Sequence, residues 1–262
     1  MEEGAVSVNR VKTAILTGYG INADRELAEA LGRAGSEVSF LHLHDVMSGP
    51  EMLQNYHIIG FPGGFSFGDH LGSGLVLAGK CKKYLRKELE RFVEAGNLII
   101  GICNGFQVLV KMGILPNLSG NWSREVSLIH NESGRFEDSW VEVRFNRENR
   151  SPWTRGLSDM ELPIRHGEGR FITGNDDVLE TLVASHCIAV TYKERNPNGS
   201  TADIAGITDR TGRILGLMPH PEAFLYRENH PRWTRDRANG PTGPTGIELF
   251  KNGVEYVEQK LI

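Results

Sequence analysis

The stretch Asn97-Leu-Ile-Ile-Gly-Ile-Cys-Asn-Gly-Phe-Gln-Val-Leu-Val-Lys-Met-Gly-Ile-Leu115 decides the fold. Its apolar run from Leu98 to Ile102 predicts a buried parallel strand, and residues 106–112 predict a buried helix directly after it. Cys103 lies at the junction, with a glycine two residues before it and another two residues after it. Glycines allow the sharp bend that turns a strand into a helix. The stretch therefore predicts a nucleophile elbow with cysteine at its tip.

The predicted position of Cys103 favours nucleophilic chemistry. A thiol at a helix N-terminus lies at the positive end of the helix dipole, which favours the thiolate. The backbone amide of Asn104 points the same way and can stabilise an oxyanion. Most free cysteines are small buried hydrophobic residues, however, so this stretch alone leaves both interpretations open. A base elsewhere in the chain has to decide between them.

The bulk composition excludes several classes of protein. With 262 residues and 39% hydrophobic residues, the chain predicts a globular α/β protein with a substantial core. A net charge of -4 implies no nucleic-acid-binding face. The three cysteines are widely separated, which argues against disulfides or a zinc site and fits the cytoplasm. The acidic N-terminus lacks a signal-peptide core, and no apolar run approaches the ~20 residues of a membrane span.

The first βα turn resembles a dinucleotide-binding fingerprint. A strand predicted over Val11 to Leu16 leads into Gly18-Tyr-Gly-Ile-Asn-Ala23, and Asp45 follows the next predicted strand, Glu37 to Leu43. Asn22 and Asp24 fall where a helix cap belongs, and any first βα turn of a parallel sheet needs permissive residues. A dinucleotide-dependent oxidoreductase therefore remains an alternative.

Two further glycine-rich segments follow. A third strand, Tyr56 to Phe61, ends in Pro62-Gly-Gly-Phe-Ser-Phe-Gly-Asp69, where the amide of Gly64 is a candidate second oxyanion donor or part of an ordinary turn. The segment Gly74-Leu-Val-Leu-Ala-Gly-Lys-Cys81 imitates a phosphate-binding loop, but a cysteine replaces the Ser or Thr that would hold magnesium. It predicts instead the start of a helix reaching Glu94, so we expect this chain to bind no ATP by itself.

Beyond the elbow the pattern becomes antiparallel. Trp140 to Phe145 alternates polar and apolar residues, and further strands are expected at Ile188 to Tyr192 and Ile204 to Ile207. His166 and Glu168 are two residues apart on a segment expected to be extended, so their side chains would share a side. That pair either grips a substrate or forms a polar hairpin edge.

A histidine near the end of the chain decides the role of the cysteine. A strand from Arg213 to Met218 runs into Pro219-His220-Pro221-Glu222, and the two prolines predict a rigid extended turn. A carboxylate beside an imidazole fixes its tautomer and stabilises the imidazolium that forms when it takes a thiol proton. The sequence therefore favours a cysteine hydrolase. The Arg-, Pro- and Gly-rich segment from Tyr226 to Thr245 is a solvated surface or borders the site or a partner, and Gly246 to Leu261 predicts a closing amphipathic helix.

The motifs around Cys103, Gly64 and His220 resemble those of the class I, triad-type glutamine amidotransferases. Asn104, the phenylalanines of residues 62–69 and the segment His166-Gly-Glu-Gly-Arg170 are similar, more narrowly, to the glutaminase subunits of phosphoribosylformylglycinamidine synthases. The likeness covers the chain from about Val11 to its end. It implies a flavodoxin-like, mostly parallel sheet with helices on both faces and an added antiparallel region. Residues 1–10 would be an N-terminal extension and residues 11–262 one amidotransferase domain.

The resemblance also implies roles for residues. Cys103 would attack the carboxamide of glutamine, His220 would pass the proton to departing ammonia, and Glu222 would orient His220. The remaining implied roles are oxyanion binding by the amides of Gly64 and Asn104, and contact with glutamine by Gln107, His166 and Glu168; no metal site is expected.

The resemblance implies partners as well as residues. Ammonia would pass to a large synthetase subunit, with a small accessory subunit, where ATP and magnesium activate formylglycinamide ribonucleotide for conversion to formylglycinamidine ribonucleotide in purine biosynthesis. This chain would carry no cofactor, and neither nucleic acid nor membrane would be a partner. The alternatives are a glutaminase subunit for another acceptor, the oxidoreductase described above, and an inactive scaffold that regulates a synthetase.

Overall fold

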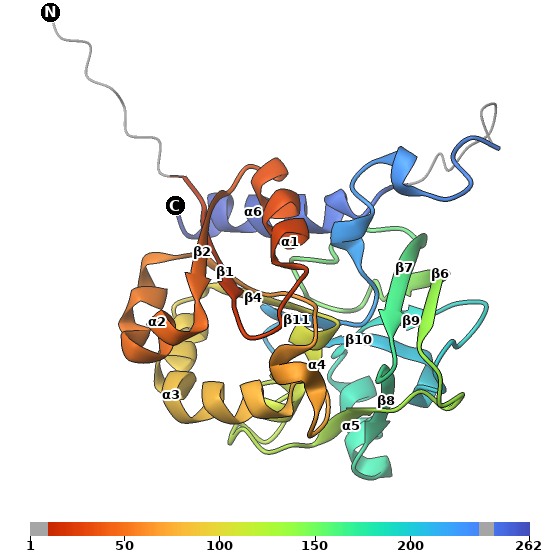
Figure 1. Cartoon of the computed structure of the whole chain (residues 1–262), viewed down its shortest axis with the longest axis horizontal. Helices are drawn as coiled ribbons and strands as arrows, with labels where there is room; N and C mark the ends of the chain where they lie inside the picture. The colour runs from red at the N-terminus through yellow and green to blue at the C-terminus, as the bar shows by residue number, and fades with distance from the viewer. Residues whose placement is uncertain (1–9, 236–243) are drawn as a thin grey trace, which may run out of the picture.

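The computed structural model describes residues 10–235 and 244–262 of the chain, which form a nine-stranded sheet flanked by helices (Figure 1). In spatial order the strands are β2 (Glu37–His42), β1 (Lys12–Thr17), β3 (Ile58–Phe61), β4 (Leu98–Ile102), β11 (Ile214–Leu217), β10 (Ile204–Thr208), β9 (Ile188–Tyr192), β6 (Glu137–Phe145) and β7 (Met160–His166).

The sheet has a parallel half and an antiparallel half. From β2 to β11 every neighbouring pair is parallel, and from β11 to β7 every pair is antiparallel. All residues of β3, β4 and β11 are buried, which explains why these strands are continuous apolar runs with no alternation. The predicted fold class, a mostly parallel sheet with an added antiparallel region, is confirmed.

Helices cover both faces of the sheet, as expected. Figure 1 shows α1 (Asp24–Arg33) and α6 (Ile247–Lys260) together at the top of the view, and α3 (Leu75–Glu94) and α4 (Asn104–Met112) below. Helix α1 packs on α6, and α3 packs on α4. The remaining elements are α2 (Leu43–Ser48), α5 (Asp176–Ala184) and a separate antiparallel pair, β5 (Val126–Ile129) with β8 (Arg170–Thr173).

The segment that imitates a phosphate-binding loop is helical. Gly74 is the residue before α3, and Lys80 and Cys81 lie inside that helix, with the cysteine fully buried. Because its backbone amides point along the helix, the segment offers no open loop of N–H groups to a phosphate. The predicted helix to Glu94 is confirmed.

Two regions singled out in the sequence fall partly outside the described residues. Of the predicted extension over residues 1–10, only Arg10 is described, and residues 236–243 of the Arg-rich segment also lie outside. In the described ranges, no helix combines the length and the apolar character that crossing a bilayer would require.

Candidate active site

Cys103 occupies the predicted bend between β4 and α4. Its backbone angles are φ 51° and ψ -106°, a left-handed conformation that is costly for a residue with a side chain. Two hydrogen bonds hold it there: Cys103 N donates to Leu217 O at 2.8 Å, and Gln107 N donates to Cys103 O at 3.0 Å. The strand beside it and the first turn of its own helix therefore fix the direction of the thiol.

Gly105 allows the helix to start so close to the sheet. A Cβ atom at this position would lie 1.9 Å from the carbonyl oxygen of Phe61, the last residue of β3. The first turn of α4 therefore packs directly on the backbone of the neighbouring strand. Cys103 is 6% exposed and lies at the N-terminus of that helix.

His220 is fixed on both sides. Its backbone N donates to Pro163 O at 2.8 Å, and its Nδ1 lies 2.6 Å from Oε1 of Glu222. The predicted extended turn is wrong, because Pro221–Ala223 forms a single 3₁₀ turn. That turn brings the carboxylate of Glu222 within hydrogen-bonding distance of the imidazole of His220. An extended backbone would hold the two side chains further apart.

The charges around His220 favour its protonated form. Burial opposes the positive charge, but the carboxylate of Glu222 and the sulfur of Cys103 outweigh it and raise the pKa of His220 to about 10. The Nδ1 atom faces the carboxylate, whereas Nε2 is buried and has no hydrogen-bond partner among the described residues. This nitrogen is therefore free to exchange a proton with the sulfur and with a substrate.

Two backbone N–H groups beside Cys103, those of Gly64 and Asn104, have no acceptor among the described residues. Gly64 has φ +146°, and a Cβ there would lie 2.8 Å from Asn22 N, so only glycine fits. Its N–H makes no hydrogen bond to any described residue. The N–H of Asn104 is the first of α4 and has no intrahelical acceptor. The Asn104 side chain also accepts from Ser66 N at 3.2 Å and so ties the glycine loop to the helix.

The segment that resembled a dinucleotide fingerprint supports this loop instead. Asn22 N and Ala23 N both donate to Gly63 O, at 3.3 and 3.2 Å, and Phe65 N donates to Gly20 O at 2.9 Å. The amides of Asn22 and Ala23, just before α1, are therefore occupied by the chain itself and are not open to a pyrophosphate. The predicted side-chain caps are wrong: Ala23 is the N-cap of α1, and the Asp24 carboxylate accepts from Thr17 Oγ1 instead.

A cavity of about 160 Å³ opens at these groups, a size that suits an amino acid rather than a dinucleotide. Within the described ranges, no cluster of three or more His, Cys, Asp or Glu side chains is arranged to hold a metal ion. The cavity is lined by Cys103, His220, Gly64, Asn22, Ala23, Phe65, Phe136, Asp138 and Arg165.

Three residues proposed to contact glutamine do not line this cavity. The amide of Gln107 donates to Glu168 O at 2.5 Å and accepts from Asn104 Nδ2 at 2.9 Å. The Glu168 carboxylate accepts from Ser73 N at 3.1 Å and pairs with Lys111 Nζ at 3.7 Å. Both side chains thus belong to a buried polar network beneath the elbow, and their role as substrate contacts stays a prediction.

The His166 side chain also points away from the cavity and contacts Asn131. Its Nδ1 lies 3.1 Å from Asn131 Oδ1, and it is 3% exposed. Burial, with a smaller contribution from the charge of His220, lowers the pKa of His166 to about 4. The expectation that His166 and Glu168 share a side is wrong, because β7 ends at His166 and the two side chains bind different partners.

Arg165 is a cavity residue that the sequence analysis missed. Its Nη2 lies 2.7 Å from Glu26 Oε2 and 3.4 Å from Nδ1 of His220, and its carbonyl oxygen is 3.7 Å from Cys103 Sγ. It pairs in register with Asp138 across β6 and β7. In the sequence, the position of Arg165 next to His166 was the one feature that could have indicated a role for it. Its place in the cavity follows only from the register of β6 and β7.

Comparison with known proteins agrees with this arrangement. A family model described as a CobB/CobQ-like glutamine amidotransferase domain matches residues 10–257. The chain is 40% identical over 260 residues to the phosphoribosylformylglycinamidine synthase subunit PurQ of Dehalococcoides mccartyi, covering 96% of this chain and 100% of that protein. It is 39% identical over 265 residues to PurQ of Methanococcus maripaludis, covering 94% of this chain and 97% of that one.

A solved structure gives the same result. A chain in the structure of PurLQS from Thermotoga maritima has 31% sequence identity and a TM-score of 0.74, covering 95% of this chain and 100% of that chain. The chain therefore belongs to the CobB/CobQ-like glutamine amidotransferase family, in its group of phosphoribosylformylglycinamidine synthase PurQ subunits.

Proposed function

We propose that this chain hydrolyses glutamine at Cys103 and supplies the ammonia to a synthetase that converts formylglycinamide ribonucleotide to formylglycinamidine ribonucleotide. The observation that carries the proposal is the hydrogen-bonded pair of His220 and Glu222 beside a cysteine held at a strand-to-helix bend. The acceptor rests on the relatives, which are named as subunits of phosphoribosylformylglycinamidine synthase.

The first half-reaction makes a thioester. The Cys103 thiolate attacks the carboxamide carbon of glutamine, and the N–H groups of Gly64 and Asn104 stabilise the negative charge on its oxygen. The His220 imidazolium gives its proton to the departing nitrogen, so that the C–N bond breaks and ammonia leaves. Glu222 keeps the imidazole oriented and balances its charge.

The second half-reaction releases glutamate. Neutral His220 takes a proton from water, whose oxygen attacks the thioester carbon. The C–S bond then breaks, the sulfur leaves as the thiolate, and His220 is again protonated. Glutamine and water are thus converted to glutamate and ammonia, and Cys103 is regenerated.

A partner subunit fits the surface around the cavity. Phe65 and Phe136 line the cavity and are 49% and 53% exposed. Exposed aromatic side chains at the mouth of a small site favour coverage by another protein. The PurLQS assembly of Thermotoga maritima contains a chain similar to this one. We propose a large synthetase subunit, which would hold ATP and magnesium, and a small accessory subunit, with the complex in the cytoplasm.

The test is labelling with a chloroketone analogue of glutamine, followed by peptide mapping. Adduct at Cys103 alone is expected, because burial raises the pKa of the Cys81 thiol to about 12 and also raises that of Cys187. Adduct at Cys81 or Cys187 in place of Cys103 would reject the assignment. Cys103→Ser is the matched control and should abolish labelling.

Turnover separates the proposal from its rivals. Glutamate release should be slow with the chain alone and should rise when the synthetase is added. No release under either condition would favour an inactive scaffold, and saturable quenching of protein fluorescence by NADH would favour the oxidoreductase.

A further inference from the structure

A second and larger pocket lies at the other end of the central strands. It has a volume of about 660 Å³, within the range of small-molecule sites. Arg213 lines it immediately before β11, whereas His220 follows the same strand. At about 3.3 Å per residue, the seven intervening steps place the pocket roughly 20 Å from the catalytic histidine. It is therefore separate from the glutamine site.

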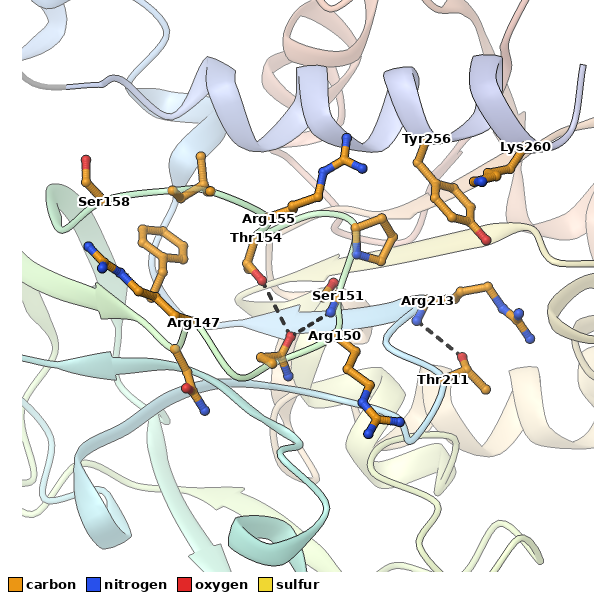
Figure 2. Close-up of a pocket in the computed structure, with 16 residues that line it drawn as sticks. Arg147, Arg150, Ser151, Thr154, Arg155, Ser158, Thr211, Arg213, Tyr256 and Lys260 are labelled. Carbon is orange, nitrogen blue, oxygen red and sulfur yellow. Dashed lines mark hydrogen bonds between the residues drawn. The ribbon is translucent and has the colours of Figure 1, made fainter.

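The lining of this pocket is strongly basic. Five of its sixteen lining residues are Arg or Lys, and none of the sixteen is Asp or Glu, although the whole chain has a net charge of -4. Figure 2 shows Tyr256 and Lys260 on α6 above the loop that carries Arg147 and Arg150, with Arg213 on the strand side. Three separate segments of the chain thus contribute positively charged residues to the lining of one pocket.

Most of these cations have no partner in the described part of the chain. Arg147, Arg150 and Lys260 are exposed, and their side chains make no hydrogen bond or ion pair with any described residue. The Nε atom of Arg213 is buried and likewise has no hydrogen-bond acceptor there. Of the five cations, Arg155 alone has an ion-pair partner among the described residues, Glu255 at 3.6 Å. A buried guanidinium nitrogen without an acceptor is unfavourable unless a ligand supplies one.

The neighbouring acidic groups are already engaged. The Glu148 carboxylate lies 3.3 Å from His186 Nδ1, and the Asp209 carboxylate accepts from Thr211 and from Ile214 N. These acids therefore do not pair with the unpartnered arginines.

The floor of the pocket is rigid. The Asn149 side chain donates to His186 O at 2.6 Å and to Thr208 Oγ1 at 3.0 Å, and it accepts from Ser151 N at 3.0 Å. It thereby ties the turn that begins at Arg150 to His186, two residues before β9, and to Thr208, the last residue of β10. A site held in this way loses little conformational freedom when it binds a ligand.

We propose that this pocket binds a phosphate ester of nucleotide size. Planar guanidinium groups bind phosphate oxygens through paired, charge-assisted hydrogen bonds, which explains the excess of arginine. The volume exceeds what inorganic phosphate would fill. Apolar and aromatic residues among the lining, Phe145, Pro152, Leu157 and Tyr256, supply a wall for the organic part of the ligand.

The test is calorimetric titration of the full-length chain with magnesium-free ADP. Saturable binding is expected, with a dissociation constant below about 1 mM at low salt that weakens as salt is raised. The double variant Arg147→Gln/Arg150→Gln should weaken binding at least about tenfold, because it removes charge-assisted hydrogen bonds. The matched control is Lys87→Gln/Arg91→Gln, with the same change of charge on α3, and should bind as the unchanged chain does.

Two further ligands test the chemistry. Adenosine should not bind measurably, and pyrophosphate should bind less tightly than ADP. Equal affinity for adenosine and ADP would overturn the role of the arginines, and equal affinity for pyrophosphate would overturn the nucleotide size. Absence of ADP binding, or equal weakening in the control variant, would overturn the proposal. Chloroketone labelling of Cys103 should be unchanged in both double variants, which separates this test from that of the proposed function.

Discussion

The Nδ1 atom of His220 lies 2.6 Å from Oε1 of Glu222, and both side chains are almost completely buried. In such a site a carboxylate strongly favours the imidazolium, because the low local dielectric strengthens the attraction between the two charges enough to outweigh their loss of hydration. The pair therefore stabilises a proton on the imidazole, as the raised pKa of His220 indicates.

Replacing Glu222 by Gln should slow glutamine hydrolysis by at least about 100-fold while the protein stays folded. The amide keeps the shape of the side chain but removes the negative charge that stabilises imidazolium. The measurement is kcat for glutamate release in the complex with the synthetase, together with the circular dichroism spectrum. Glu180→Gln, on the exposed side of α5, is the control; equal kcat in the two variants would contradict the role of Glu222.

The stability supplied by His220 should decrease at alkaline pH. Its folded-state pKa of about 10 lies above the unfolded value of about 6.5, so the stabilisation is complete below pH 6.5 and is lost as pH rises toward 10. The measurement is the free energy of unfolding in urea at pH 6, 8 and 10 for the unchanged chain and for His220→Gln. The difference between them should shrink with pH, and a constant difference would count against the raised pKa.

His166 should have the opposite effect at acidic pH. Its folded-state pKa of about 4 lies below the unfolded value, so the unfolded chain takes up a proton first. Stability is therefore lost as pH falls from 6.5 to 4, by up to about 1.4 kcal/mol per pH unit. His166→Gln should reduce the slope of the unfolding free energy against pH by this contribution, whereas the exposed His130→Gln should keep it. An unchanged slope in His166→Gln would refute the lowered pKa.

Two helical glycines should respond oppositely to alanine. Gly105→Ala places a Cβ 1.9 Å from Phe61 O and should destabilise the fold by about 1–3 kcal/mol. Gly79→Ala in α3 meets no atom within 4 Å and should stabilise by up to about 1 kcal/mol. Chemical denaturation measures both, and a neutral Gly105→Ala would show that α4 does not pack so closely on β3.

Removing the Asn104 side chain should reduce kcat about tenfold with little change in KM. Asn104→Ala keeps the backbone N–H donor but loses the hydrogen bond from Ser66 N that holds the Gly64 loop. The measurement is steady-state glutamate release in the complex, with the exposed Asn121→Ala as the control. A variant with full kcat would show that the loop is held by other contacts.

The sequence by itself determined the parts that depend on neighbours along the chain. The apolar run from Leu98 to Ile102 and the glycines around Cys103 predicted the strand, the bend and the helix, because each depends on local residues. The spacing of His220 and Glu222 predicted their pairing, because two residues so close in sequence can contact each other without help from distant segments. Their local backbone was predicted wrongly as an extended turn, since the prolines permit a 3₁₀ turn as well.

Only the tertiary structure decided which residues from distant segments meet. Arg165 reaches His220 because β7 lies beside the turn after β11, and Gln107 and Glu168 point into a network rather than the cavity because Asn104 and Lys111 lie there. The basic pocket combines residues 145–158, residues 211–213 and the end of α6. Such contacts depend on sheet order and register, which arise from packing of the whole core and have no signature in any single stretch of sequence.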